Sequence, residues 1–362
     1  MNDTAHMRHA LVLAARALGR VAPNPAVGCV IVSPDALVVG RGATQDGGRP
    51  HAETVALEQA GEAARGATAY VTLEPCAHFG KTPPCADALV KAGIARVVIA
   101  NVDPDSRVNG KGIAILRDAG ITVEAGLLKN EAAALNEGFL LKVMRSRPMV
   151  TLKIAQSFDG RTAAASGESK WITGEEARRF GHLLRAQHDA ILVGIETARV
   201  DDPDLTCRLP GLETLSPMRV VLDSKLRLSS ESKLAQTART IPTLVFTTVS
   251  GGDALTALGV DIIRVEPDAL GRPVLGTVLT HLAAQGITRL LVEGGATVHT
   301  AFFNAGFADR LEIFTAPLAL GAGGRGAIDA LTVGKLNEAP NFVRISGRSF
   351  GKDRLESCAA RP

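Results

Sequence analysis

The chain alternates short β-rich segments with helical patterns, and this alternation limits the folds that it can adopt. In the first half we expect, in order, a helix over 4–18, strands over 27–32 and 37–40, a helix over 51–64, a strand over 69–73, a helix over 85–91, a strand over 96–101, a helix ending at Gly120 and a strand over 121–124. After the first helix, the order ββαβαβαβ predicts an α/β sandwich.

The same alternation starts again near residues 145–148, where the sequence reads Arg-Ser-Arg-Pro. Beyond this point, with helical patterns between most of them, strands are expected over 149–155, 190–193, 219–222, 243–247, 261–265, 289–292 and 311–314. The length of 362 residues also suits two domains. We therefore predict two α/β domains over 1–147 and 148–362, with the boundary placed to within several residues.

The composition excludes several classes of partner. Lysine plus arginine (40) nearly balances aspartate plus glutamate (37), and aromatic residues make up only 4% of the chain, so a general nucleic-acid surface is not expected. No apolar run approaches the ~20 residues of a membrane span, and the short apolar stretch 10–15 is not a secretory signal. We predict a cytoplasmic protein that acts on a small molecule, and leave a homo-oligomer open. The five cysteines are too few, and odd in number, for a disulfide framework.

The sharpest local pattern is His51-Ala52-Glu53, followed by Cys76 and Cys85 in Pro-Cys-Ala-His-Phe-Gly-Lys-Thr-Pro-Pro-Cys. One imidazole and two thiolates form a three-ligand zinc set that leaves a fourth position for water. Zinc lowers the pKa of such a water to about 7. Glu53 lies two residues beyond His51 and suits a general acid/base that carries a proton to a leaving amine. The pattern predicts hydrolytic deamination of an aromatic ring, as in zinc nucleobase deaminases.

Each part of this pattern has a plainer interpretation. His-Ala-Glu is common in helices, and two cysteines separated by eight residues are a weak metal signal by themselves. A structural zinc would need a fourth ligand, for which His78 is the only nearby candidate. Cys29, and equally Cys207 and Cys358, are interpreted as small buried apolar residues. The joint order of helix, strand and Pro-Cys turn favours the catalytic zinc.

The second half contains one candidate anion site. A strand over 289–292, the turn Glu293-Gly294-Gly295 and a helix over 296–304 would point free backbone amides at a ligand. Without other information, a simple strand-to-helix turn is equally expected. Residues 321–326 fit the letters G-x-G-x-x-G, but no long helix and acidic second strand follow, so we interpret them as a flexible glycine loop.

Taken together, these motifs resemble the family of bifunctional riboflavin-biosynthesis deaminase/reductases. The resemblance covers nearly the whole chain and rests on the segments 23–28, 51–53, 75–85, 152–153, 157–161, 166–173, 201–208 and 292–295. It implies a cytidine-deaminase-like α/β/α sandwich followed by a dihydrofolate-reductase-like α/β domain. It also implies zinc-dependent deamination of 2,5-diamino-6-ribosylamino-4(3H)-pyrimidinone 5′-phosphate. NADPH then reduces the ribosyl side chain to ribityl, giving 5-amino-6-(5-phosphoribitylamino)uracil.

The resemblance also assigns roles to individual residues. Zinc is bound by His51, Cys76 and Cys85, with Glu53 as the catalytic residue. The residues at the deaminase substrate are Asn24, His78 and Lys81. Those at the reductase substrate are Ser169, Arg185, Leu205, Arg208 and Glu293. Those at the cofactor are Ala155, Trp171, Thr197, Asp201 and Ser224, to which the turn adds Gly294 and Gly295.

Without the resemblance, several of these residues would be assigned ordinary structural roles. Trp171 would be a core residue, and each of Arg185 and Arg208 would form a surface ion pair. Two departures from the family pattern concern substrate contacts: Thr44 stands where a histidine is frequent, and Asp105-Ser106 replaces Asn-Pro. The preference for NADPH over NADH rests on the resemblance only.

Three rival functions remain at this stage. A zinc deaminase of nucleosides or tRNA adenosine would leave residues 148–362 without a role. A binding module with a structural zinc predicts that Glu53→Gln has no effect. In the third, one half has lost its activity, although the zinc ligands and the base are all present.

Overall fold

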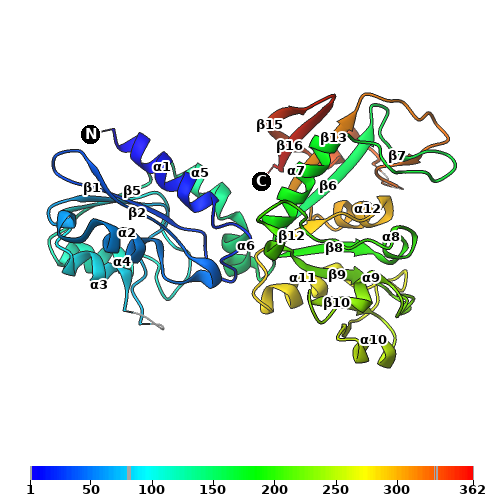
Figure 1. The fold of residues 1–362 in the computed structure, drawn as a ribbon, viewed down its shortest axis with the longest axis horizontal. Coiled ribbons are helices and arrows are strands. Elements are labelled where there is room, and N and C mark those ends of the chain that lie inside the picture. The colour runs from blue at the N-terminus through cyan, green and yellow to red at the C-terminus, as the bar shows by residue number, and fades with distance from the viewer. Residues whose placement is uncertain (1, 80–82, 330, 332, 362) are drawn as a thin grey trace. The chain divides into compact units, whose positions relative to one another are not determined.

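The computed structural model describes residues 2–79, 83–329, 331 and 333–361 (Figure 1). By its internal contacts, the chain divides into two compact units, Met1–Arg147 and Pro148–Pro362. None of the described helices is long and apolar enough to cross a membrane.

The first unit is built on one five-stranded sheet in the order β2-β1-β3-β4-β5. The strands are β1 (Gly28–Val32), β2 (Val38–Ala43), β3 (Thr68–Val71), β4 (Arg96–Ile99) and β5 (Thr122–Ala125). β1 is antiparallel to β2 and β3, whereas β3, β4 and β5 run parallel. The carboxyl ends of β3 and β4 therefore point the same way, and Pro75 and Cys76 follow β3 at that edge.

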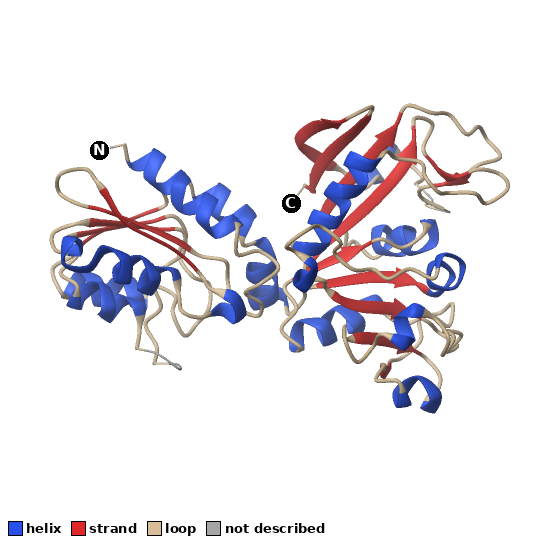
Figure 2. Cartoon of the chain, in the orientation of Figure 1, coloured by secondary structure: helices blue, strands red, loops and turns tan. Residues whose placement is uncertain are grey.

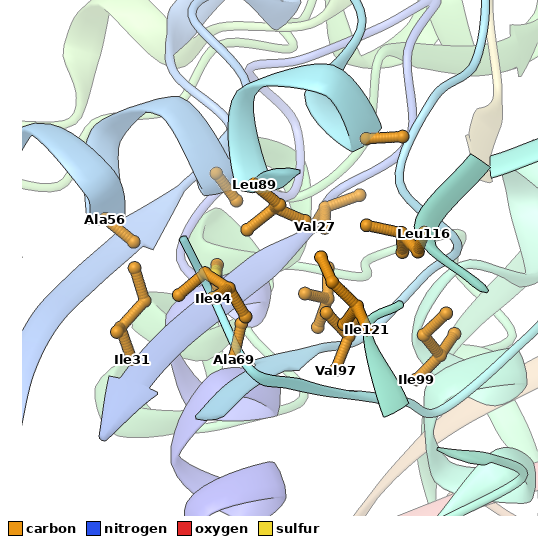
Figure 3. Close-up of a cluster of buried hydrophobic side chains, with 14 of the residues drawn as sticks. Val27, Ile31, Ala56, Ala69, Leu89, Ile94, Val97, Ile99, Leu116 and Ile121 are labelled. Atoms are coloured by element: carbon orange, nitrogen blue, oxygen red, sulfur yellow. The ribbon is translucent and has the colours of Figure 1, made fainter. Parts of the chain in front are cut away.

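Helices cover both faces of this sheet (Figure 2). They are α1 (Asp3–Ala15), α2 (Ala52–Ala60), α3 (Cys85–Lys91), α4 (Lys111–Asp118), α5 (Lys129–Leu135) and α6 (Glu137–Arg145). Alternate residues of a strand face opposite sides, so Cys29 and Ile31 pack under α2, α3 and α4, while Val30 and Val32 pack under α1 and α5. Figure 3 shows the first of these two cores. The predicted α/β/α sandwich is confirmed.

The second unit is built on a nine-stranded sheet in the order β11-β10-β9-β8-β12-β6-β13-β16-β15. Its strands are β6 (Met149–Ser157), β8 (Ala190–Gly194), β9 (Met218–Leu222), β10 (Thr243–Thr247), β11 (Asp261–Arg264), β12 (Arg289–Val292), β13 (Arg310–Ala316), β15 (Phe342–Phe350) and β16 (Asp353–Ala360). The pairs from β11 to β13 are parallel, and β16 is antiparallel to both β13 and β15. β7 (Arg161–Ala163) and β14 (Arg325–Gly326) form a separate small pair.

Two apolar clusters cover the faces of the large sheet. Its helices are α7 (Glu175–Ala186), α8 (Ile195–Asp201), α9 (Lys233–Gln236), α10 (Asp253–Ala257), α11 (Leu275–Ala284) and α12 (Ala296–Asn304). α11 and α12 contribute to the cluster with Leu152 and Leu192, and α7 to α10 contribute to the cluster with Ile191 and Val193. The sheet is thus buried on both faces, as expected for parallel strands joined by helices.

The elements differ from expectation in several places: the first helix ends at Ala15 and not at residue 18, and the short pair of β7 and β14 was not predicted. The helix expected over 51–64 ends as an α-helix at Ala60 and continues as a 3-10 turn over Gly61–Ala64, because Gly61 has a φ of 53°. α5 and α6 were not predicted. The hairpin of β15 and β16 was also missed, because most side chains of β15 are exposed and carry no apolar alternation.

Candidate functional site

The predicted zinc ligands lie together in the first unit. His51 Nδ1 is 3.3 Å from Cys85 Sγ and 3.6 Å from Cys76 Sγ. All three donor atoms lie within 4.8 Å of one another, and no second cluster of this kind occurs in the described part of the chain. His51 is the N-cap of α2, Cys85 is the first residue of α3, and Cys76 lies in the loop after β3. This donor set fits a zinc ion with three protein ligands.

Thiolate character lies mainly at Cys76. A hydrogen bond from the Cys85 side chain lowers the pKa of Cys76 to about 4, against the opposing effect of burial, and His51 adds to this lowering. The backbone amide of Cys85, at the start of α3, also donates to Cys76 Sγ at 3.3 Å. The start of α3 therefore favours the thiolate form of Cys76 through a backbone N–H group.

Glu53 lies beside these ligands without belonging to their cluster. Its side chain is only 3% exposed, and it occupies the second position of α2. Burial, which is the larger effect, and the negative charge of Cys76 together raise the pKa of Glu53 to about 7. A carboxyl group with a pKa near 7 can both accept and return a proton at neutral pH, which is the requirement for a general acid/base.

The loop that carries Asn24 is fixed from two sides. The Thr44 hydroxyl accepts a hydrogen bond from the Val27 amide at 3.0 Å and donates to the Pro25 carbonyl at 3.2 Å. The Asn136 side chain pairs with both backbone groups of Ala26, each at 2.9 Å. Thr44 therefore has a structural role here. Asn136 was missed because its partner lies 110 residues away.

Asn24 precedes the zinc ligands in the sequence, and His78 lies between Cys76 and Cys85. Asn24 packs against Gly48, where an added Cβ would lie 1.9 Å from Nδ2, so only glycine fits there. The Nδ1 atom of His78 is buried and has no hydrogen-bond partner among the described residues. An unpartnered ring nitrogen is costly, as expected of a group that meets a ligand. Lys81 lies outside the described residues.

The second departure from the family pattern forms an ion pair. Arg107 Nε donates to both carboxylate oxygens of Asp105 at 3.0 Å, and the Asp105 amide donates to Asp103 at 2.9 Å. Burial raises the pKa of Asp103 to about 6. The charge of Asp105 is thus neutralised by Arg107, in the turn that follows β4.

In the second unit, Arg185 and Glu293 form a buried bidentate ion pair. Arg185 Nε and Nη2 donate to the two Glu293 oxygens at 2.8 and 2.9 Å, and the side chains are only 14% and 11% exposed. Burial would raise the pKa of Glu293, but the charges of Arg185 and Lys153 outweigh it and hold the pKa at about 2. The prediction of a surface ion pair for Arg185 is wrong, because its partner, Glu293, directly follows the buried strand β12.

The loop over 201–208 meets this ion pair. Arg185 Nη1 donates to the Thr206 carbonyl at 2.9 Å. Leu205 is buried and has a φ of 57°, so the chain turns sharply there. Arg208 is exposed and lies 3.7 Å from Asp204, as a surface ion pair would. Ser169 is half-buried and lies on a separate loop.

The glycine turn before α12 has the predicted form. Gly294 and Gly295 join β12 to α12, and Gly295 is the N-cap of that helix. An added Cβ on Gly294 would lie 2.9 Å from Val298 Cβ, and one on Gly295 would lie 3.6 Å from Thr197 Oγ1. The structure therefore brings the turn and Thr197 together beside free helix amides, which is a suitable place for a phosphate group.

The remaining cofactor residues are more dispersed. Trp171 is 65% exposed, with the Arg178 guanidinium 4.6 Å above its ring, so the prediction of a core position is wrong. Lys170 Nζ lies 3.5 Å from Asp201 Oδ1. Because Lys170 precedes Trp171 in the chain, this ion pair links the Trp171 segment to Asp201. Ala155 is half-buried on β6, and the Ser224 carbonyl accepts from Thr248 after β10. Neither forms a hydrogen bond with the other cofactor residues in the described part of the chain.

The glycine loop over 321–326 is held by a side chain. Asp159 accepts hydrogen bonds from the amides of Leu320, at 3.1 Å, and Gly321, at 2.7 Å. The loop then enters β14, which pairs with β7. Within the described residues no α-helix follows, which agrees with the rejection of a dinucleotide-binding fingerprint there.

Comparison with known proteins covers both units. Residues 1–101 match the cytidine and deoxycytidylate deaminase zinc-binding region, and residues 148–350 match the RibD C-terminal domain. The riboflavin biosynthesis protein RibD of Aquifex aeolicus is 43% identical, over 97% of this chain and 96% of its own. An Acinetobacter baumannii RibD structure is 41% identical with a TM-score of 0.90, over 99% of both chains. The Thermotoga maritima diaminohydroxyphosphoribosylaminopyrimidine deaminase/5-amino-6-(5-phosphoribosylamino)uracil reductase is 34% identical with a TM-score of 0.87, over 99% of both chains.

A zinc-binding deaminase domain joined in one chain to a reductase domain defines a bifunctional enzyme. The chain belongs to the RibD family of riboflavin biosynthesis proteins. Its zinc site and its use of a nicotinamide cofactor follow from these two domains.

Proposed function

We propose that this enzyme deaminates 2,5-diamino-6-ribosylamino-4(3H)-pyrimidinone 5′-phosphate and then reduces the ribosyl chain of the product with NADPH. The observation that carries the proposal is the His51, Cys76 and Cys85 cluster with a buried, non-ligating Glu53, in one chain with a reductase domain. The domains over 1–147 and 148–362 would carry the two steps. The balanced charge favours a small-molecule substrate in the cytoplasm over a nucleic acid.

In the deamination, water replaces the ring amino group and ammonia leaves. Zinc, when bound by His51, Cys76 and Cys85, supplies Lewis-acid activation of water at neutral pH. Glu53 accepts a proton from the attacking water and delivers it to the departing amine, which the raised pKa of its carboxyl group permits. Asn24, His78 and Lys81 orient the pyrimidine and its phosphate.

In the reduction, NADPH supplies a hydride, and the protein positions the two reactants. Gly294 and Gly295 offer the amides at the start of α12 to the cofactor diphosphate. We assign Ala155, Trp171, Thr197, Asp201 and Ser224 to the rest of the cofactor. Ser169, Leu205 and the arginines Arg185 and Arg208 hold the substrate and its phosphate, with Glu293 beside Arg185.

The hydride acceptor would be the open-chain imine formed when the ribosylamine ring opens. Hydride adds to its first carbon, and a proton adds to nitrogen, so the chain becomes a ribityl amine. The test is to reduce the deaminated substrate with NADPH carrying deuterium at the transferred position. Deuterium at the first carbon of the ribityl chain is the expected result, and deuterium at any other carbon would contradict the proposal. The same assay with NADH measures the cofactor preference.

A further inference from the structure

His182 lies next to the reductase residues but has no role in the function proposed above. It is on α7, three residues before Arg185, and residues with this spacing share one face of a helix. His182 Nδ1 is 3.1 Å from the Thr206 carbonyl and 3.3 Å from the backbone nitrogen of Arg208. His182 and Arg185 thus contact the same loop, and both reach the same carbonyl, that of Thr206.

The two neighbours of Nδ1 require opposite protonation states. Without a proton, Nδ1 accepts a hydrogen bond from the Arg208 amide, and the ring proton is then on Nε2. With a proton, Nδ1 donates to the Thr206 carbonyl instead. Nε2 has no hydrogen-bond partner among the described residues, and it is not one of the buried unpartnered atoms. His182 is only half-buried, so Nε2 is available to a ligand.

The charges around His182 are mixed. Arg185 acts on it from its own helix, Arg208 from the loop, and Glu293 from the turn after β12, while Asp204 pairs with Arg208 at 3.7 Å. Burial lowers the pKa of His182, and the charges of Arg185 and Arg208 lower it further. An imidazole between two arginines is therefore neutral at pH 7 in the free protein, and a bound dianion would reverse this balance.

We propose that His182 is a third residue of the substrate-phosphate site, neutral in the free protein and protonated when the phosphate binds. This inference rests on the proposed function, which places the phosphate at Arg185 and Arg208. On binding, His182 takes one proton from solvent, Nε2 donates to the phosphate, and Nδ1 donates to the Thr206 carbonyl. Phosphate binding is thereby coupled to the position of the loop over 204–208.

The direct test follows the protonation of His182 in the full-length zinc-loaded protein. Histidine is labelled with ¹³C, and the His182 ring signal is identified as the one that disappears in His182→Asn. Its titration is measured in sodium sulfate, in ribose 5-phosphate and in sodium chloride of equal ionic strength. Sulfate does not titrate near neutrality, so a change with sulfate belongs to the protein. We expect both dianions to raise the midpoint by about one pH unit or more, as for an opposite charge within hydrogen-bonding distance.

Two variants separate binding from a merely structural role. Asn at position 182 retains a polar group near Nδ1 and loses the Nε2 donor, whereas Gln retains a neutral donor near Nε2. In the wild type, KM for the deaminated substrate should rise with pH between the free-state and bound-state midpoints of His182, by up to about tenfold per pH unit, and level off above the bound-state midpoint, with kcat at saturation unchanged. His182→Gln should lose this pH dependence, and His182→Asn should raise KM at all pH values. His281→Gln, in the same unit on α11, is the control and should follow the wild type.

The outcomes distinguish the two proposals. An unchanged His182 midpoint in both dianions, in a protein that reduces the phosphorylated substrate, would overturn the role of His182 and leave the proposed function standing. If the wild type oxidises no NADPH with the deaminated substrate, the proposed function fails, and the sulfate titration still decides whether His182 responds to a bound dianion.

Discussion

Among single residues, Glu53 has the most demanding proposed role, because it must both accept and donate a proton. It is almost fully buried, it lies two residues from a zinc ligand, and it has no other described carboxylate in the ligand cluster with which to share its task. A buried carboxyl group without a permanent counter-charge is expensive to retain for stability alone. We therefore attribute its position to the proposed proton transfer.

Glu53→Gln should retain zinc and the fold while ammonia release falls by at least about 100-fold, the usual contribution of a general acid/base. Zinc content is measured by atomic absorption, and ammonia by a coupled assay. Glu58→Gln, on the exposed side of α2, is the matched control and should keep full activity. Full activity in Glu53→Gln would return the structural-zinc hypothesis.

The buried pair of Arg185 and Glu293 should dominate the local stability of the reductase unit. Glu293→Gln leaves the guanidinium of Arg185 without a counter-charge, which costs about 3–5 kcal/mol in comparable buried pairs. We expect a loss of that order in the free energy of unfolding, measured by urea titration. Glu196→Gln removes an exposed partner of Arg227 and should change it by less than about 1 kcal/mol. Equal effects in the two variants would show that the pair is not buried in solution.

At the scale of elements, His188 ties the end of α7 to β6. It is fully buried, its Nδ1 lies 2.7 Å from the Leu184 carbonyl, and its Nε2 lies 2.9 Å from the Thr151 hydroxyl. A neutral ring satisfies both contacts, with Nδ1 donating and Nε2 accepting. Burial lowers the pKa of His188 to about 3.

This buried histidine predicts a pH dependence of stability. Between pH 3 and about 6.5 the unfolded chain binds a proton at His188 that the folded chain does not, so folding stability rises with pH across this window. The contribution is up to about 1.4 kcal/mol per pH unit. His188→Gln should flatten the slope of unfolding free energy against pH relative to the wild type. Identical slopes would mean that the histidine is protonated in the folded protein.

The sequence patterns predicted some helices and strands and missed others. The sandwich of the first unit and the parallel strands of the second were predicted because their side chains are buried on regular alternating or continuous patterns. The hairpin of β15 and β16 was not, since β15 is an edge strand whose side chains, such as Arg344 and Arg348, are mostly exposed. The zinc ligands were predicted from the joint order of His-x-Glu helix, strand and Pro-Cys turn, because the cysteine spacing alone is a weak signal. Contacts such as Asn136 with Ala26, or His182 with Thr206, join distant segments and leave no local signal.

For the whole molecule, the two units place two reactions in one chain. The zinc cluster lies entirely within Met1–Arg147, and the Arg185–Glu293 pair with the glycine turn lies within Pro148–Pro362. Each unit has its own sheet and its own apolar clusters. A change at Glu53 should therefore leave the reductase step intact, because every residue that we assign to that step lies in the second unit.

The central claim is that deamination and reduction follow one another on the same substrate. The most direct measurement is NADPH oxidation by the purified protein, started with the undeaminated diaminopyrimidinone ribosylamine phosphate. We predict a signal that Glu53→Gln abolishes and that the deaminated compound restores in the same variant. Oxidation that persists in Glu53→Gln with the undeaminated substrate would contradict the order of the steps, and no oxidation with either compound would contradict the reductase assignment.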